Sequence, residues 1–200
     1  MATSTGGPPA LAKLFAKLAA PLPPIVIVQH MPQAFTGPFA DRLNSLGSIE
    51  VREAVDGDEL RPNLALLAPG GKHLRVRSHG SRFRAVVFDG EPVSSHKPSA
   101  DVLLRSVAEC FGKRSLGVIM TGMGRDGADG CNALVSAGGY VLGQDEPTSD
   151  VYGMNKVAFA EGGVSKQAPL DELPSLIEEY VRRTFRLTST FSPIAGPAKT

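Results

Sequence analysis

The chain has 200 residues and a formal net charge of +1, from 21 Lys and Arg against 20 Asp and Glu. Hydrophobic residues make up 42% and charged residues 20%, which excludes a wholly disordered chain and predicts one globular domain with a hydrophobic core. The near-neutral charge gives no electrostatic reason to expect nucleic acid or a membrane surface as the main partner.

Targeting signals and cysteine spacing indicate where the protein is located and whether it holds a metal or disulfides. No apolar run reaches the roughly 18 residues that span a bilayer, and the first residues lack the basic start and apolar core of a signal peptide. We therefore expect no membrane insertion and a cytoplasmic location. The two cysteines, Cys110 and Cys131, have the spacing of neither a metal site nor a disulfide framework, so we expect two small buried residues.

Hydrophobic periodicity divides the chain into alternating helices and strands. Residues 10–19 read as an amphipathic helix, with Pro8 and Pro9 in its first turn, and residues 25–28 as a strand that is buried on both faces. Residues 188–200 have little to bury and are predicted to be a disordered tail. Further helices are expected at 33–46, 99–111, 127–137, 154–161 and 171–186, and further strands at 49–54, 64–68, 73–77, 83–88, 116–120 and 140–143.

This alternation predicts a three-layer, doubly wound α/β fold with a mostly parallel sheet. The short strands within residues 49–90 are expected to form a local antiparallel ribbon attached to that sheet. In such sheets, functional sites collect beyond the carboxyl ends of the strands. The loops at those ends are therefore the places to look for chemistry.

Three such loops carry a serine, a histidine and an aspartate. Ser4 lies in a turn of small residues before the first helix, where it could be a nucleophile or part of a phosphate-binding loop. His30 directly follows the strand at 25–28, where it could be a general base or a structural histidine. Asp126 lies in a glycine-rich loop after the strand at 116–120, where it could orient His30 or cap the next helix. It could also bind a metal together with Asp129, but the loop offers few other acidic ligands for a metal. Together the three residue types are those that nucleophilic catalysis requires.

The motifs in these loops resemble the catalytic domain of the chemotaxis protein-glutamate methylesterase family, CheB. The matched segments are 3–7, 29–32 and 121–127, with 39–43, 68–70, 96–103 and 152–154, and the resemblance covers about residues 2–185. It implies a Ser-His-Asp hydrolase that removes methyl esters from glutamates of methyl-accepting chemotaxis receptors, with glutamine deamidation as a second activity. It also implies that no cofactor or metal is needed, and that residues 1–187 form the catalytic domain.

The resemblance assigns a role to each matched residue. It implies that Ser4 is the nucleophile, His30 the general base and Asp126 the residue that orients His30. Thr5 and Met123 match positions at the border of the oxyanion site. His96 lies in another matched segment and is a candidate for lining the cleft.

The sequence departs from the family pattern at its start. Family members usually carry a receiver domain before the catalytic domain, so a receiver protein acting in trans is an alternative for regulation. The pattern also places an apolar strand before the serine, whereas only Met1, Ala2 and Thr3 precede Ser4, and Ala2 replaces a usual glycine. The first strand is therefore expected to be missing. A hydrolase of another ester or amide, and a non-catalytic module that binds signalling helices, stay as alternatives.

Overall fold

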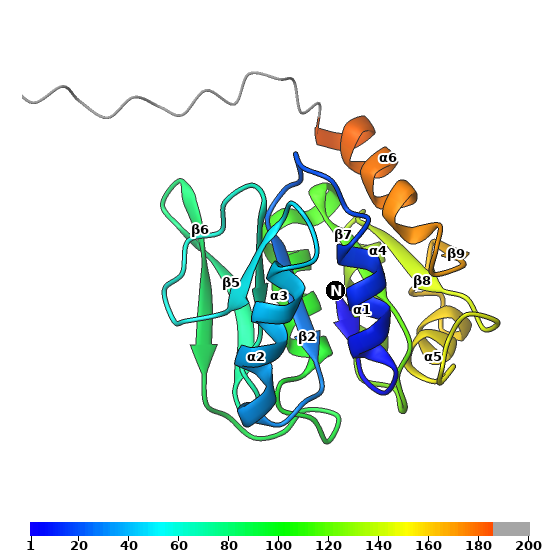
Figure 1. Cartoon of the computed structure of the whole chain (residues 1–200), viewed down its shortest axis with the longest axis horizontal. Coiled ribbons are helices and arrows are strands. Elements are labelled where there is room, and N and C mark those ends of the chain that lie inside the picture. The colour runs from blue at the N-terminus through cyan, green and yellow to red at the C-terminus, as the bar shows by residue number, and fades with distance from the viewer. Residues whose placement is uncertain (186–200) are drawn as a thin grey trace, which may run out of the picture.

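A parallel sheet of seven strands forms the centre of the computed structural model, which describes residues 1–185 (Figure 1). Its strand order is β3-β4-β2-β1-β7-β8-β9, and every neighbouring pair is parallel. The predicted tail at 188–200 lies outside the described residues. The strands are β1 (Ala2–Thr3), β2 (Ile25–Gln29), β3 (Glu50–Glu53), β4 (Leu64–Leu67), β7 (Leu116–Ile119), β8 (Tyr140–Gln144) and β9 (Lys166–Ala168).

Helices cover both faces of this sheet, which confirms the predicted three-layer α/β fold (Figure 1). One core layer joins the sheet to α1 (Gly7–Phe15), α2 (Gln33–Asn44) and α6 (Leu173–Phe185). The other joins it to α3 (Ala100–Phe111), α4 (Ala128–Ser136) and α5 (Met154–Ala160). Along β2, Ile25 and Ile27 face the first layer while Val26 and Val28 face the second, because successive strand residues point to opposite faces. A short 3-10 turn, Gly112–Arg114, leads from α3 to β7.

The first strand is present, so the expectation that it is missing is wrong. β1 has only two residues, but it occupies the central position of the sheet and pairs with β2 on one side and β7 on the other. Ala2 is fully buried. Two residues carry too little periodicity to be recognised as a strand, and it is the two flanking strands that hold them in the sheet.

The middle of the chain also differs from the prediction. β3 and β4 join the main parallel sheet, and only β5 (His73–His79) and β6 (Arg82–Phe88) form a separate antiparallel pair. That hairpin packs its apolar side on α3, adding Leu74, Val76 and Ala85 to the second core layer. β9, at the edge of the sheet, was not predicted. The two cysteines are free; Cys131 is buried and Cys110 half-buried.

The chain changes direction across the sheet at β1. After β1 it builds β2, β3 and β4 on one side, and after the β5–β6 hairpin it builds β7, β8 and β9 on the other. Such a reversal opens a crevice beyond the carboxyl ends of the central strands. The sheet topology therefore directs attention to the loops that follow β2, β1 and β7.

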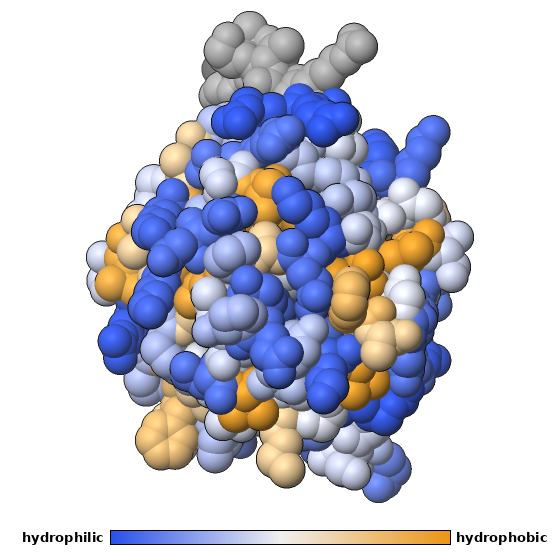
Figure 2. Space-filling model, turned by 90° about the vertical axis from the view of Figure 1, so that its right-hand side faces the viewer, coloured by the Kyte–Doolittle hydropathy of each residue, from blue (hydrophilic) through white to orange (hydrophobic). Residues whose placement is uncertain are grey.

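The outer surface shows no helix suited to a bilayer. Within residues 1–185, none of the helices is both long and apolar enough to cross a membrane. The face shown in Figure 2 is largely hydrophilic, with hydrophobic side chains in small separate groups. Among the exposed large hydrophobic residues are Phe35 and Met123, with 60% and 71% of their surface accessible.

At the amino end of β1, an apolar cavity of about 150 Å³ lies between β2 and β7. Its lining includes Met1, Val26 and Val118. The amino group of Met1 is buried there and donates to the carbonyl of Val26 at 2.7 Å. Burial lowers the pKa of this amine from 8.0 to about 5, because an apolar site disfavours the charged form.

We predict that adding a three-residue Val-Ile-Val segment before Met1 raises the Tm by several degrees, because it fills the cavity and extends β1 between its two neighbours. In the parent chain the unfolded state binds more protons than the folded state between pH 5 and 8. Stability should therefore be full above pH 8 and fall by up to roughly 4 kcal/mol as the pH drops to 5. The extension removes the amine from the cavity and should abolish this dependence.

Thermal unfolding from pH 5 to 8 measures both effects. A Gly-Ser-Gly extension of equal length is the control, because it removes the buried amine without filling the cavity. It should flatten the pH dependence and raise the Tm less than the apolar segment. Equal Tm values for the two extensions would contradict the cavity argument.

Candidate active site

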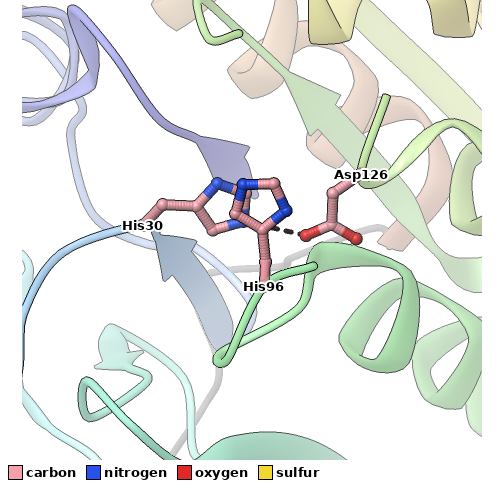
Figure 3. A group of neighbouring side chains, drawn as sticks. All are labelled: His30, His96 and Asp126. Carbon is pink, nitrogen blue, oxygen red and sulfur yellow. Dashed lines mark hydrogen bonds and ion pairs between the residues drawn. The ribbon is translucent and has the colours of Figure 1, made fainter. Parts of the chain in front are cut away.

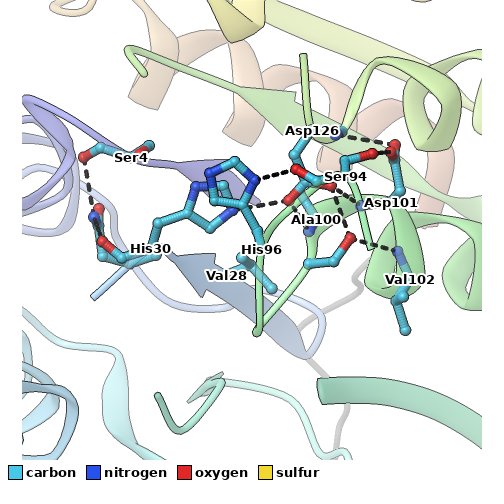
Figure 4. A network of polar contacts seen from close by, with 12 residues as sticks. Ser4, Val28, His30, Ser94, His96, Ala100, Asp101, Val102 and Asp126 are labelled. Carbon is cyan, nitrogen blue, oxygen red and sulfur yellow. Dashed lines mark hydrogen bonds and ion pairs between the residues drawn. The ribbon is translucent and has the colours of Figure 1, made fainter. Parts of the chain in front are cut away.

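The three predicted catalytic side chains follow three neighbouring strands. Ser4 comes directly after β1, His30 directly after β2, and Asp126 lies in the loop after β7. Because β2, β1 and β7 are adjacent and parallel, their carboxyl ends meet at one edge of the sheet. Figure 4 shows His30 between Ser4 and Asp126. The structure thus brings together residues that are up to 122 positions apart in the sequence.

Close backbone packing fixes the serine loop. The amide of Ser4 donates to the carbonyl of Thr121 at 3.0 Å, and the carbonyl of Ser4 accepts from the amide of Gly7 at 2.8 Å. Gly6 adopts a left-handed conformation, with φ of 78°, just before α1. At Gly122 an added methyl group would lie 2.8 Å from Cβ of Ser4. Glycine at this position therefore lets the loop after β7 touch the serine.

Gln29 links the serine loop to His30, a role that the sequence analysis missed. This buried amide donates to the carbonyl of Ser4 at 3.0 Å and to the carbonyl of His30 at 2.9 Å. Its oxygen accepts from the hydroxyl of Thr3 at 2.7 Å. A polar residue at the end of an otherwise apolar strand was the available signal. Gln29 thus holds the loops after β1 and β2 in a fixed relation.

Asp126 is fully buried and accepts four hydrogen bonds. Nε2 of His30 lies 2.8 Å from Oδ2, and the hydroxyl of Ser99 donates to Oδ1 at 2.7 Å. The amides of Ala100 and Asp101, at the start of α3, donate at 2.7 and 3.1 Å. Burial by itself would raise the pKa of Asp126, but the hydrogen bonds from His30, Ala100, Ser99 and Asp101 outweigh it and the pKa is lowered. Asp126 is therefore held as a carboxylate.

The bond to Asp126 determines which nitrogen of His30 can act as a base. A carboxylate only accepts hydrogen bonds, so the proton of the neutral ring lies on Nε2 and the lone pair on Nδ1. Nδ1 is buried and has no hydrogen-bond partner among the described residues. The hydroxyl of Ser4 is likewise without a partner within residues 1–185. Two unpaired side-chain atoms of the site are thus a candidate base and a candidate nucleophile.

The predicted oxyanion residues lie beside these atoms in sequence. Thr5 follows Ser4 and precedes α1, whose N-terminus favours negative charge. Met123 follows Gly122, the residue in contact with Ser4. In the described part of the chain, the backbone amides of Thr5 and Met123 have no hydrogen-bond partner. Both are therefore available as donors to an oxyanion.

His96 completes a cluster with His30 and Asp126, whose ligand atoms all lie within 4.8 Å of one another (Figure 3). The arrangement does not fit a metal ion. The two imidazole rings are stacked, with centroids 3.8 Å apart and planes 11° from parallel, whereas a metal about 2.1 Å from each nitrogen must lie in both ring planes. Both oxygens of Asp126 are also occupied by hydrogen bonds.

Two other aspartates near this site have structural partners. Asp129 forms ion pairs with Arg105 and Arg125, so it is not placed to share a metal with Asp126. Asp101 lies in the first turn of α3. Its carboxylate accepts from the amides of Gly127 and Gly130 at 2.9 and 2.8 Å. Asp101 therefore caps α4, the helix that Asp126 was considered to cap.

The fold and this edge define the class of protein: a doubly wound α/β protein that gathers a serine, a histidine and a buried aspartate beyond its central strands. Comparison with known proteins gives the family. The sequence profile of the CheB methylesterase family matches residues 1–177, and the chain belongs to this family.

Individual relatives agree with this assignment. The chain is 49% identical over 178 residues to a protein-glutamate methylesterase/protein-glutamine glutaminase of Dechloromonas aromatica, covering 89% of this chain and 50% of that protein. It is 50% identical over 178 residues to one of Treponema denticola, covering 88% and 48%. The chain thus spans about half the length of these relatives. The crystal structure of the Thermotoga maritima CheB methylesterase catalytic domain matches with a TM-score of 0.88 at 35% identity, over 90% of this chain and 96% of that one.

We predict that Asp126→Asn lowers both activity and stability. The side chain of asparagine can accept hydrogen bonds through its oxygen only. Its NH₂ group would face buried groups that donate to Asp126, so those donors would lose their acceptor. Turnover should fall about 10⁴-fold, as in other triads that lose the acid, and the Tm should drop by several degrees. Asp129→Asn is the matched control, because its carboxylate pairs with arginines at the surface. Equal effects of the two substitutions would contradict the role given to Asp126.

We predict that Gln29→Leu lowers activity by about ten- to hundredfold, because it frees the loops of Ser4 and His30 from each other. It should also lower the Tm, since buried carbonyls lose a donor. The rate at which a fluorophosphonate labels Ser4, measured well below the Tm, separates misplacement from unfolding. A labelling rate equal to that of the parent chain would contradict this role for Gln29.

Proposed function

We propose that this domain is a protein-glutamate methylesterase in which Ser4, His30 and Asp126 are the catalytic residues. The observation that carries the proposal is the pairing of Nε2 of His30 with buried Asp126, which leaves Nδ1 free on the side of Ser4 (Figure 4). The relatives from Dechloromonas aromatica and Treponema denticola carry the name of this activity. No cofactor takes part.

The mechanism is an acyl transfer in two steps. Nδ1 of His30 takes the hydroxyl proton of Ser4 as the serine oxygen attacks the ester carbonyl. The amides of Thr5 and Met123 stabilise the tetrahedral oxyanion, and Asp126 stabilises the imidazolium. The imidazolium returns its proton to the leaving oxygen and methanol departs. His30 then activates a water molecule that releases the glutamate carboxylate and regenerates Ser4.

The same groups suit a second reaction. A glutamine side chain presents a carbonyl of the same geometry, and the proton held by His30 allows ammonia to leave in place of methanol. Deamidation of glutamine is therefore part of the proposal, and the names of the relatives include it. An amide is a poorer acyl donor than an ester, so methyl ester hydrolysis should be the faster activity.

The partners in this proposal are methyl-accepting chemotaxis receptors, with a receiver domain as a candidate regulator. Phe35, in the first turn of α2, and Met123, after β7, expose apolar surface on segments that begin at this edge of the sheet. They offer contacts for a receptor segment beside the reacting glutamate. The proposal places the protein in the cytoplasm and involves neither nucleic acid nor membrane insertion.

We predict that the parent chain releases methanol from methylated chemoreceptor membranes and that Ser4→Ala lowers turnover by roughly four to six orders of magnitude, because the nucleophile is lost. His30→Gln should have a comparable effect. Ser81→Ala is the matched control, since Ser81 is an exposed residue between β5 and β6. Release that persists in Ser4→Ala would refute the assignment of the nucleophile.

Two further measurements separate the alternatives. A fluorophosphonate that labels the parent chain but not Ser4→Ala excludes a non-catalytic binding module. Labelling without methanol release from receptors would instead favour a hydrolase of another ester or amide.

A further inference from the structure

His96 covers one face of the imidazole of His30. The ring centroids are 3.8 Å apart and the planes differ by 11° (Figure 3). The side chain of His30 is only 10% exposed, although it lies at the open edge of the sheet. Rotation of His30 about its Cβ–Cγ bond would drive the ring into His96, so the stack opposes the motion that would break the bond to Asp126.

The turn that carries His96 has an unfavourable backbone. Ser94 and Ser95 adopt φ angles of 51° and 64°, a left-handed conformation that costs residues with a Cβ atom. Two such residues in succession persist only where surrounding contacts impose them, and they concentrate at functional sites. Here the two residues lead directly into His96. The strain is therefore located where it sets the position of this ring.

Hydrogen bonds hold the turn in place. Nδ1 of His96 lies 2.6 Å from the carbonyl of Ser94. The hydroxyl of Ser94 donates to Oδ2 of Asp101 at 3.1 Å (Figure 4), and the other oxygen of Asp101 accepts from Gly127 and Gly130. Asp101 thus ties the turn of His96 to the loop that carries Asp126. Asp126 contacts the edge of the His30 ring and His96 contacts its face, and Asp101 holds the segments that carry both.

We propose that His96 is a positioning residue that holds His30 in the orientation required for proton transfer. A carbonyl only accepts, so Nδ1 of His96 donates to the carbonyl of Ser94 and fixes the orientation of the ring. The parallel stack of the two rings restricts the tilt of His30 and so keeps its Nε2 aimed at Asp126. This role rests on the proposed function, because it concerns proton transfer from Ser4 to His30. His96 acts through His30 and needs no contact with the substrate.

The test compares His96→Leu with His96→Phe. Both residues fill the space of the imidazole, but only Phe can stack on His30. His96→Leu should lower kcat for methyl ester hydrolysis by about ten- to hundredfold with KM changed less than about twofold, since misplacement of a catalytic group affects the chemical step. His96→Phe should restore kcat to within about threefold of the parent chain. His79→Leu is the matched control, because His79 is exposed on β5.

A spectroscopic readout makes the test independent of catalysis. The Nε2–H proton of His30 is assigned in the NMR spectrum of the parent chain by its loss in His30→Gln. We expect this resonance to broaden or vanish in His96→Leu and to remain in His96→Phe. Sharp His30 resonances in both variants with parent kcat values would overturn the proposal. Equal losses of kcat in both variants, with the resonance intact, would also overturn it and indicate direct contact with substrate.

Failure of the proposed function gives a different result. If the parent chain hydrolyses no methyl ester but the resonance depends on position 96 as expected, then the positioning role stands and the substrate assignment falls. The remaining alternative is that activity needs a bound metal ion, and measuring kcat with and without EDTA tests it. A loss of activity on chelation would overturn the positioning role in favour of a metal held by His30, His96 and Asp126.

Discussion

The buried carboxylate of Asp126 is the constraint on which the rest of this site depends. A charge in an apolar interior is strongly unfavourable unless its hydrogen-bonding capacity is filled. Four donors fill it here, and they come from the end of β2 and from the start of α3. Any displacement of one of these segments would leave the charge under-coordinated. The geometry of the base is thus a consequence of how the fold satisfies one buried anion.

A reciprocal arrangement ties this anion to the second core layer. Asp126 precedes α4 but accepts from the first amides of α3, while Asp101 belongs to α3 but accepts from amides at the start of α4. Each helix N-terminus, with its partial positive charge, therefore faces a carboxylate from the other helix. Burial raises the pKa of Asp101, and its carboxylate neighbour adds to that effect, whereas the pKa of Asp126 is lowered. Of these two adjacent acids, the one that contacts His30 is the one with the lowered pKa.

The sequence was sufficient to predict the layers of the fold and the three catalytic candidates, because both depend on local patterns. A β-branched run such as residues 25–28 and a glycine-rich loop such as residues 121–127 are recognisable without knowing their neighbours. The position of β1 could not be predicted, because two residues become a strand only between β2 and β7. The membership of β3 and β4 in the main sheet was missed for a similar reason, since short strands do not encode their partners.

The contacts around His30 that sequence reasoning missed share a different physical cause. The function of Gln29 depends on which carbonyls lie within reach of its amide, and that distance is set by the meeting of β1 and β2. His96 is oriented by two serines in a left-handed conformation, which propensity assigns to glycine. Holding each of these serines there costs roughly 1–2 kcal/mol, against a net stability of roughly 5–15 kcal/mol for a whole domain. The strained pair leads directly into His96, whose ring stacks on His30, so the cost is located where it sets the position of one ring over the other.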